Sequence, residues 1–100
     1  MFLLTKYPEL EIERMPVLSK FYGIVIRMVF IRPFAAHFHA IYGQWELIVG
    51  IMPLTIVQGD APGRVREMVL GWAAEHQCEL LEAWTRCSSA LPPRPIRPLH

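Results

Sequence analysis

The sequence predicts an α+β domain, in which an antiparallel meander of three or four strands is followed by a C-terminal helix or helical hairpin packed on one face of the sheet. Before Gly59, apolar residues alternate with a period of two, which is typical of half-buried strands. After Pro62 they recur with helical spacing. Because the chain has 100 residues, it can bury one hydrophobic core and is too short for a second.

The start of the chain does not share this pattern. Residues 1–14 are charged, contain Pro8 and show no sustained apolar period, so we expect a flexible N-terminal extension. Met15 offers a second start position for translation. We therefore place a single domain at residues 15–88, between this extension and a proline-rich tail at residues 89–100.

Runs of β-branched and aromatic residues predict the strands. In the first run, alternation directs Ile24, Ile26 and Met28 to the core, with Phe30 on the same face. Arg27 then points toward solvent or toward a site. The two residues between the second and third runs, Gly43 and Gln44, predict a tight hairpin. The four runs cover residues 21–31, 37–42, 45–51 and 54–57.

The helical part begins near Asp60, which we expect to be the N-cap, with Pro62 in the first turn. An apolar stripe at intervals of three and four residues continues to Leu80, and the pattern either runs unbroken to Arg86 or bends into two helices near His76. The tail after Ser89 must be extended, because it is rich in proline. The Pro-x-x-Pro spacings of the tail suit a partner groove that binds a polyproline helix. A disordered end of the chain is the simpler interpretation. The stripe consists of Val65, Val69, Trp72, His76 and Leu80.

The composition excludes several classes of protein. A net charge of +1 provides no strong field to attract nucleic acid or an anionic membrane. Charged residues interrupt every apolar stretch before it reaches the length of a membrane span, and the N-terminus lacks a secretion signal, so we expect a cytoplasmic protein. Cys78 and Cys87 lie nine residues apart in the predicted helix, on opposite sides of its axis, so we expect reduced thiols.

Three histidines and one arginine are the candidate site residues. On a strand, His37 and His39 share one face, close enough to bind the same divalent metal ion. The third ligand would be His76, or a carboxylate such as Glu75 or Glu79. Alternatively, the two strand histidines act as acid and base on RNA, with Arg27 contacting phosphate, as in a small ribonuclease toxin. The simplest interpretation is structural: His37 and His39 are half-exposed strand residues, and His76 is a core histidine bonded to a carbonyl. Apart from such a metal, no cofactor is expected.

Three segments of the chain resemble a small bacterial family catalogued as domain of unknown function 4160. The segments are MPVLSKFYGIVIRM (residues 15–28), HFHAIYG (residues 37–43) and VLGWAAEHQCELLEAW (residues 69–84). Members of this family are often encoded beside a second small protein, an arrangement that has suggested toxin–antitoxin pairs, and no enzymatic activity is established for them. The resemblance implies a fold more than a function. Our best functional hypothesis is a non-catalytic interaction module, one component of such a pair, which contacts a small protein partner or a second copy of itself through an exposed sheet edge or surplus apolar surface.

The chain departs from the family pattern at two loops. Residues 31–36 replace an acidic pair, a histidine and two prolines that precede the HFH tripeptide in the family. Met52, Pro53 and Leu54 replace a glycine-containing hairpin turn. The acidic and histidine positions of the first loop are therefore lost, which weakens the metal hypothesis for this chain.

Overall fold

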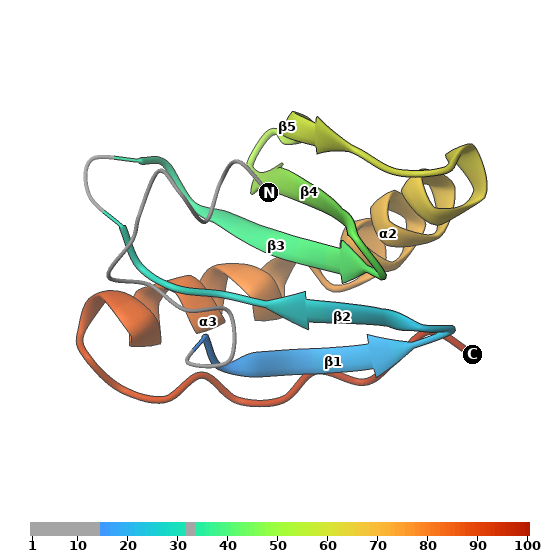
Figure 1. The fold of residues 1–100 in the computed structure, drawn as a ribbon. Helices are drawn as coiled ribbons and strands as arrows, with labels where there is room; N and C mark the ends of the chain where they lie inside the picture. The colour runs from blue at the N-terminus through green and yellow to red at the C-terminus, as the bar shows by residue number, and fades with distance from the viewer. Residues whose placement is uncertain (1–14, 32–33) are drawn as a thin grey trace.

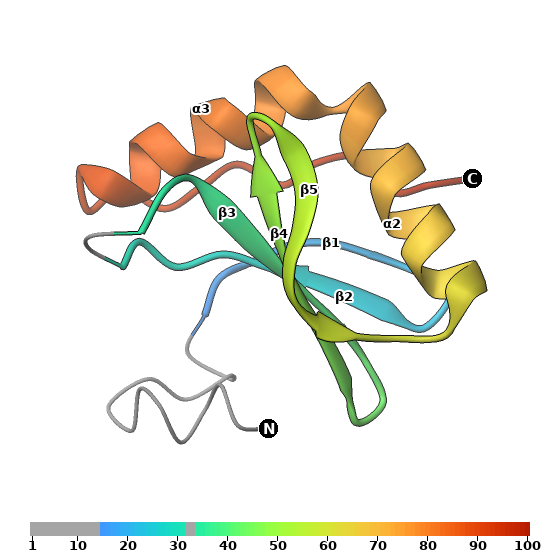
Figure 2. The same ribbon diagram turned by 90° about the horizontal axis from the view of Figure 1, so that it is seen from above.

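The computed structural model describes residues 15–31 and 34–100 of the chain. Within them, five antiparallel strands form one sheet in the order β1-β2-β3-β4-β5, and α2 and α3 both cover the same face of it (Figures 1 and 2). The predicted α+β meander with C-terminal helices is confirmed, with five strands in place of three or four. The predicted N-terminal extension lies outside the described residues. The elements are β1 (Val17–Phe21), β2 (Ile24–Arg27), β3 (His37–Tyr42), β4 (Trp45–Ile51), β5 (Leu54–Asp60), α2 (Gly63–Glu75) and α3 (Gln77–Ser88).

The strand predicted at residues 21–31 is wrong at both ends, because β2 stops at Arg27 and the chain reverses near the predicted start. Tyr22 and Gly23 both adopt positive φ, 50° and 79°, and connect β1 to β2 as a tight hairpin. Two successive positive φ angles are the signature of the turn that matches the twist of antiparallel strands. The glycine permits this turn, so the segment before Phe21 becomes an additional edge strand.

The remaining hairpins set the register of the sheet. Gly43 and Gln44 form the predicted two-residue turn, and Tyr42 pairs with Trp45 across it. The turn between β4 and β5 contains a cis peptide bond between Met52 and Pro53.

The fifth strand runs on to Asp60, beyond its predicted end. Asp60 is therefore not the helix N-cap: Pro62 occupies that position, and the Asp60 carboxylate accepts hydrogen bonds from the Ala61 amide and from Arg66.

The helical segment is broken at His76, which confirms the bent alternative over one continuous helix. His76 has φ −121°, and it ends α2 and precedes α3. The side chain of Gln77 donates a hydrogen bond of 2.6 Å to the carbonyl of Ile51, which attaches the start of α3 to the end of β4. Within the described residues, neither helix is long and apolar enough to cross a bilayer.

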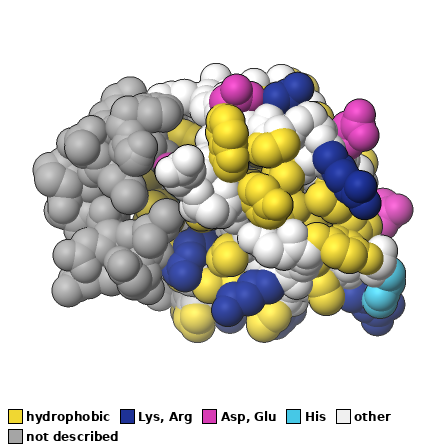
Figure 3. Space-filling view, turned by 45° about the vertical axis from the view of Figure 1, so that its right-hand side comes forward, with side chains coloured by type: hydrophobic (Ala, Val, Ile, Leu, Met, Phe, Trp, Pro, Cys, Tyr) yellow, Lys and Arg dark blue, Asp and Glu magenta, His cyan; other side chains and the backbone are white. Residues whose placement is uncertain are grey.

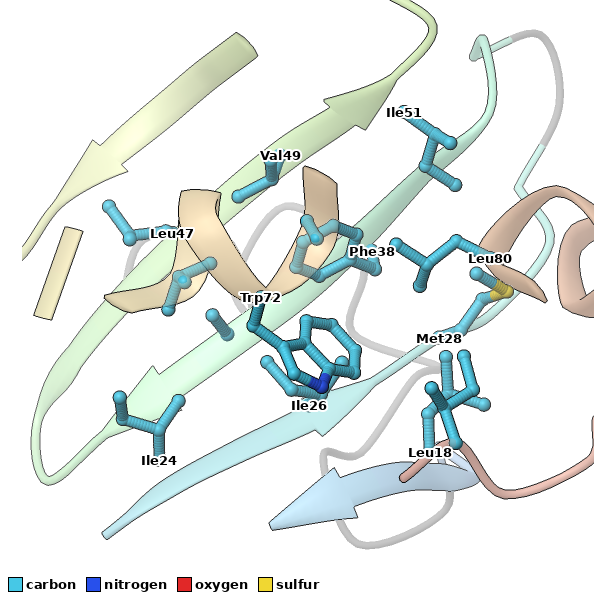
Figure 4. Packing of buried hydrophobic residues seen from close by; sticks show 14 of the residues in the cluster. Leu18, Ile24, Ile26, Met28, Phe38, Leu47, Val49, Ile51, Trp72 and Leu80 are labelled. Carbon is cyan, nitrogen blue, oxygen red and sulfur yellow. The ribbon is translucent and has the colours of Figure 1, made fainter. Parts of the chain in front are cut away.

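The core lies between the sheet and the two helices. Trp72 extends from α2 toward the strands, and its ring centroid lies 5.3 Å from that of Phe21 and 6.0 Å from that of Phe38 (Figure 4). Leu80 contributes the main apolar contact from α3. The predicted core faces are confirmed except at Phe30 and His76, which are only half-buried. The predicted core residues that are buried are Ile24, Ile26, Met28, Val65, Val69, Trp72 and Leu80. The largest fully buried side chains are Trp72, Phe38, Leu18, Ile24, Ile26, Met28, Leu47, Ile51, Leu80, His39, Val49 and Val69.

The proline-rich tail is extended, as expected, but it packs on the domain, so the prediction of a disordered end is wrong. Its backbone passes beside β1, where the Ile96 amide donates a hydrogen bond of 2.7 Å to the Leu18 carbonyl (Figure 1). The Trp72 indole donates a hydrogen bond of 2.8 Å to the carbonyl of Arg97. Ile96 is buried, so the tail covers part of one sheet edge. Among the described residues, no strand pairs with the outer edge of β5.

Candidate functional site

The sheet face opposite the helices carries the two strand histidines. Along β3, Phe38 and Ala40 point into the core, so alternation directs His37 and His39 to the other face. Both are buried nonetheless, with 6% of His37 and 1% of His39 exposed. They are therefore not the half-exposed strand residues that the simplest sequence interpretation supposed.

His39 forms a buried pair with Glu46 of the neighbouring strand. The His39 Nδ1 lies 3.1 Å from Glu46 Oε2, and only 12% of the Glu46 side chain is exposed. Because an ionised carboxylate only accepts hydrogen bonds, Nδ1 carries the proton in this contact, and in the neutral ring Nε2 is then an acceptor. The Nε2 atom is fully buried and has no hydrogen-bond partner among the described residues.

His37 is fixed at the start of the same strand. Its Nδ1 donates a hydrogen bond of 2.8 Å to the carbonyl of Ala35, and its ring centroid lies 5.3 Å from that of His39. The rings of Trp84 and Phe34 flank it, with centroids at 5.1 and 6.1 Å. Burial lowers the pKa of His37, and the nearby His39 lowers it further, whereas the hydrogen bond to the Ala35 carbonyl raises it. Burial is the largest effect, so the neutral ring is favoured.

A pocket of about 140 Å³ opens beside these two histidines. Its wall is mostly apolar, and none of the described residues that line it is a lysine, arginine, aspartate or glutamate. Phe34 and Val57 are exposed, at 44% and 63%, whereas His39 is almost completely buried. We call this cavity the histidine pocket; it is lined by Ile31, Phe34, Ala35, Ala36, His37, His39, Ile48, Gly50, Val57 and Gln58.

The three histidines predicted as metal ligands are not brought together. His76 lies at the junction of the helices, on the other side of the sheet, where its ring packs 5.4 Å from Trp72 and its Nδ1 contacts the Glu79 carboxylate. Across residues 15–31 and 34–100, no three histidine, cysteine or acidic side chains are grouped so that they could hold a metal ion. A metal at His37 and His39 would have two protein ligands from this part of the chain.

Arg27 lies in register with His39 on the adjacent strand. Its Nη1 donates a hydrogen bond of 2.7 Å to the carbonyl of Met15.

Cys78 and Cys87 are free thiols, as predicted. Burial raises the pKa of Cys87, whereas the neighbouring Arg86 lowers it.

Sequence reasoning missed Glu46, the residue that orients His39. The signal was available in the predicted hairpin. A two-residue turn at Gly43 and Gln44 fixes Tyr42 opposite Trp45, and the same register places Ile41 opposite Glu46. His39, two residues before Ile41 on the same face, is then a diagonal neighbour of the carboxylate and within reach of it.

A second surface feature lies at the opposite end of the sheet from the start of β3. Three aromatic side chains gather beside the β1–β2 and β3–β4 turns: Tyr22, Tyr42 and Trp45, with 60%, 36% and 41% of each residue exposed. Figure 3 shows hydrophobic side chains clustered on this side of the molecule, with basic side chains around them. We call this cluster the aromatic end.

A groove of about 550 Å³ adjoins the aromatic end, where the sheet meets the start of α2 and the end of the chain. Among the described residues that line this groove, Arg64 carries a permanent positive charge, and none has an acidic side chain. The groove is lined by Tyr22, Tyr42, Pro62, Arg64, Val65, Met68, Leu99 and His100.

Comparison with known proteins identifies the family but no better-characterised relative. No curated protein and no solved structure matches the chain. A family model, described as domain of unknown function (DUF4160), matches residues 23–85, which extend from the first hairpin turn through most of α3. The match includes the paired histidine and carboxylate and two of the three exposed aromatic residues. The chain therefore belongs to the family described as domain of unknown function (DUF4160).

Proposed function

We propose that this protein is a non-catalytic interaction module of the cytoplasm, one component of a two-protein, toxin–antitoxin-like pair, and that it binds its partner through the aromatic end. The observation that carries this proposal is the grouping of Tyr22, Tyr42 and Trp45, all at least one-third exposed, beside a groove. Tyrosine, tryptophan and arginine are the residues that most often dominate binding energy at protein interfaces.

The backbone supports these rings as a fixed surface. Tyr42 and Trp45 are paired across a two-residue turn, and a side-chain carbon at Gly23 would lie 3.3 Å from the Tyr42 ring. The ring of Tyr42 therefore packs over the first turn and needs little reordering on binding, which lowers the entropic cost of association.

The edges of the sheet favour a binary complex over an open polymer. The tail covers part of the β1 edge through the contact between Ile96 and Leu18, whereas no strand of the described residues pairs with the outer edge of β5. Because the tail occupies part of the β1 edge, strands of other copies cannot easily add at both edges of the sheet. Addition at both edges would propagate into fibres. A partner with an apolar segment and an acidic group suits the groove, because Arg64 lines it and no acidic side chain is among its described lining residues.

The test is a binding measurement with the product of the adjacent gene. The two proteins should co-purify at a ratio of 1:1, and Trp45→Ala should weaken the complex by about thirtyfold or more, as expected for a central aromatic contact. Met52→Ala is the matched control: Met52 is 65% exposed and lies at the far end of β4, about 20 Å along the strand.

Three results would each contradict the proposal. The first is the absence of a complex with the adjacent gene product. The second is a complex that Trp45→Ala and Met52→Ala weaken equally. The third is a dimer of this chain alone that occupies the aromatic end, which would show that the surface serves self-association.

The metal-binding and ribonuclease hypotheses stay predictions, and both are tested at His39. Less than a tenth of an equivalent of zinc, nickel or iron in protein purified without chelator would end the first. Growth inhibition that survives His39→Ala would end the second.

A further inference from the structure

We infer that the histidine pocket is a binding site for a small, uncharged, largely apolar molecule that donates one hydrogen bond, such as a phenol, to Nε2 of His39. This inference goes beyond the proposed interaction function, because none of the described residues of the aromatic end lines the pocket. Either one can fail without the other.

The first step of the argument is the unpartnered acceptor. His39 is 1% exposed, and its Nε2 has no hydrogen-bond partner among the described residues. Native proteins leave few buried polar atoms unpaired, and each one indicates strain, a missing ligand or a functional group. When the ring is neutral and Glu46 accepts the Nδ1 proton, the unpaired nitrogen accepts a hydrogen bond and cannot donate one.

The second step is the size and polarity of the pocket that His39 lines. The pocket measures about 140 Å³, which is far more than one water molecule needs and close to the volume of about 150 Å³ in which an apolar protein cavity binds benzene. Ile48 and Val57 contribute apolar walls, and a side-chain carbon at Gly50 would lie 3.5 Å from the Val57 side chain. A single six-membered ring with one polar substituent matches both properties.

The third step is charge. No lysine, arginine, aspartate or glutamate lines the pocket among the described residues, so this part of the wall offers no counter-charge to a carboxylate or an ammonium ligand. His37 faces the same pocket, and its ring is held neutral by burial. A metal ion is disfavoured for a related reason, since the described residues supply two imidazoles and no third ligand.

The experiment is a titration of the purified full chain with phenol, followed by NMR of the His39 ring nitrogens and of the Ile48 and Val57 methyl groups. We expect saturable shifts with a dissociation constant of ~1 mM or tighter. Anisole has nearly the same shape but no donor, and it should bind about tenfold more weakly, because it leaves the nitrogen unpaired.

Two variants separate the acceptor from the cavity. His39→Leu removes the acceptor, so it should abolish the difference between phenol and anisole. Val57→Trp obstructs the mouth from an exposed position that does not depend on core packing, and it should reduce binding of both ligands about tenfold or more. Leu91→Trp is the matched control, since Leu91 is also exposed but does not line the pocket, and it should bind both ligands as the natural chain does.

Three outcomes would overturn the inference. One is the absence of phenol-dependent shifts at these groups in the natural chain. Another is equal affinity for phenol and anisole, which would show that Nε2 is not the acceptor. The last is stoichiometric zinc binding that shifts the His37 and His39 ring signals and excludes phenol, which would assign the pocket to a metal.

Discussion

The pair formed by His39 and Glu46 leads to a stability prediction that can be worked out from the structure. Glu46→Ala removes the carboxylate, and Nδ1 of His39 then has no acceptor in a ring that is 1% exposed. A buried polar atom left without its partner costs about 1–3 kcal/mol, so we expect the free energy of unfolding to fall by about 2 kcal/mol. For a domain of this size, the melting temperature should fall by roughly 8–16 °C.

The conservative variant tests the cause. Glu46→Gln retains an oxygen that can accept the Nδ1 proton, so it should lose less than about 1 kcal/mol. The assay is urea unfolding, followed by far-ultraviolet circular dichroism, with unchanged slopes as evidence that the folded states are comparable.

A double-mutant cycle removes contributions unrelated to the pair. With phenylalanine at position 39, no Nδ1 is present, so Glu46→Ala in the His39→Phe background should cost at least about 1 kcal/mol less than in the natural chain. The reasoning is refuted if Glu46→Ala costs the same in both backgrounds, or if it changes stability by less than about 0.5 kcal/mol in the natural chain.

Three further predictions follow from other parts of the fold. Gly59→Ala should lower the free energy of unfolding by about 2 kcal/mol or more, because Gly59 has φ +93° and a side-chain carbon there would lie 2.1 Å from the Glu46 carbonyl oxygen. Gly71 lies in open space on α2, so Gly71→Ala should raise the free energy of unfolding by ~0.5–1 kcal/mol. Urea unfolding of both variants checks this. Ile96→Ala should cost about 2 kcal/mol and speed amide hydrogen exchange in β1, because the tail anchor is buried; exchange unchanged from the natural chain would contradict the packing. Burial lowers the pKa of His37 in the folded state, so its contribution to stability is complete above about pH 6.5 and is lost as pH falls through the lower folded value. His37→Gln should therefore flatten this part of the plot of unfolding free energy against pH. An equally steep plot for the variant would refute this prediction.

The periodic part of the fold could be predicted from sequence. Alternation correctly assigned Ile24 and Ile26 to the core face, and helical spacing correctly assigned Trp72 and Leu80, because burial of an apolar face leaves a direct record in residue order. The turn at Tyr22 and Gly23 was missed, since it interrupts a continuous run of strand-forming residues and depends on backbone angles that composition does not report.

The candidate sites were harder to predict, because each depends on contacts between separate elements. The two strand histidines were correctly placed on one face, yet their burial and the orientation of His39 by Glu46 follow from the register of β3 against β4. The tail was expected to be disordered because proline prevents regular hydrogen bonding within it. Its attachment through Ile96 and through the indole of Trp72 is a tertiary contact that no local pattern indicates.

The central functional claim concerns where the partner binds, and hydrogen exchange of this protein with and without the adjacent gene product tests it directly. The account predicts that added protection centres on the β1–β2 and β3–β4 turns and on the first two turns of α2, the segments that surround Tyr22, Tyr42 and Arg64. Protection confined to the outer edge of β5 or to the histidine pocket, with these segments unchanged, would contradict it.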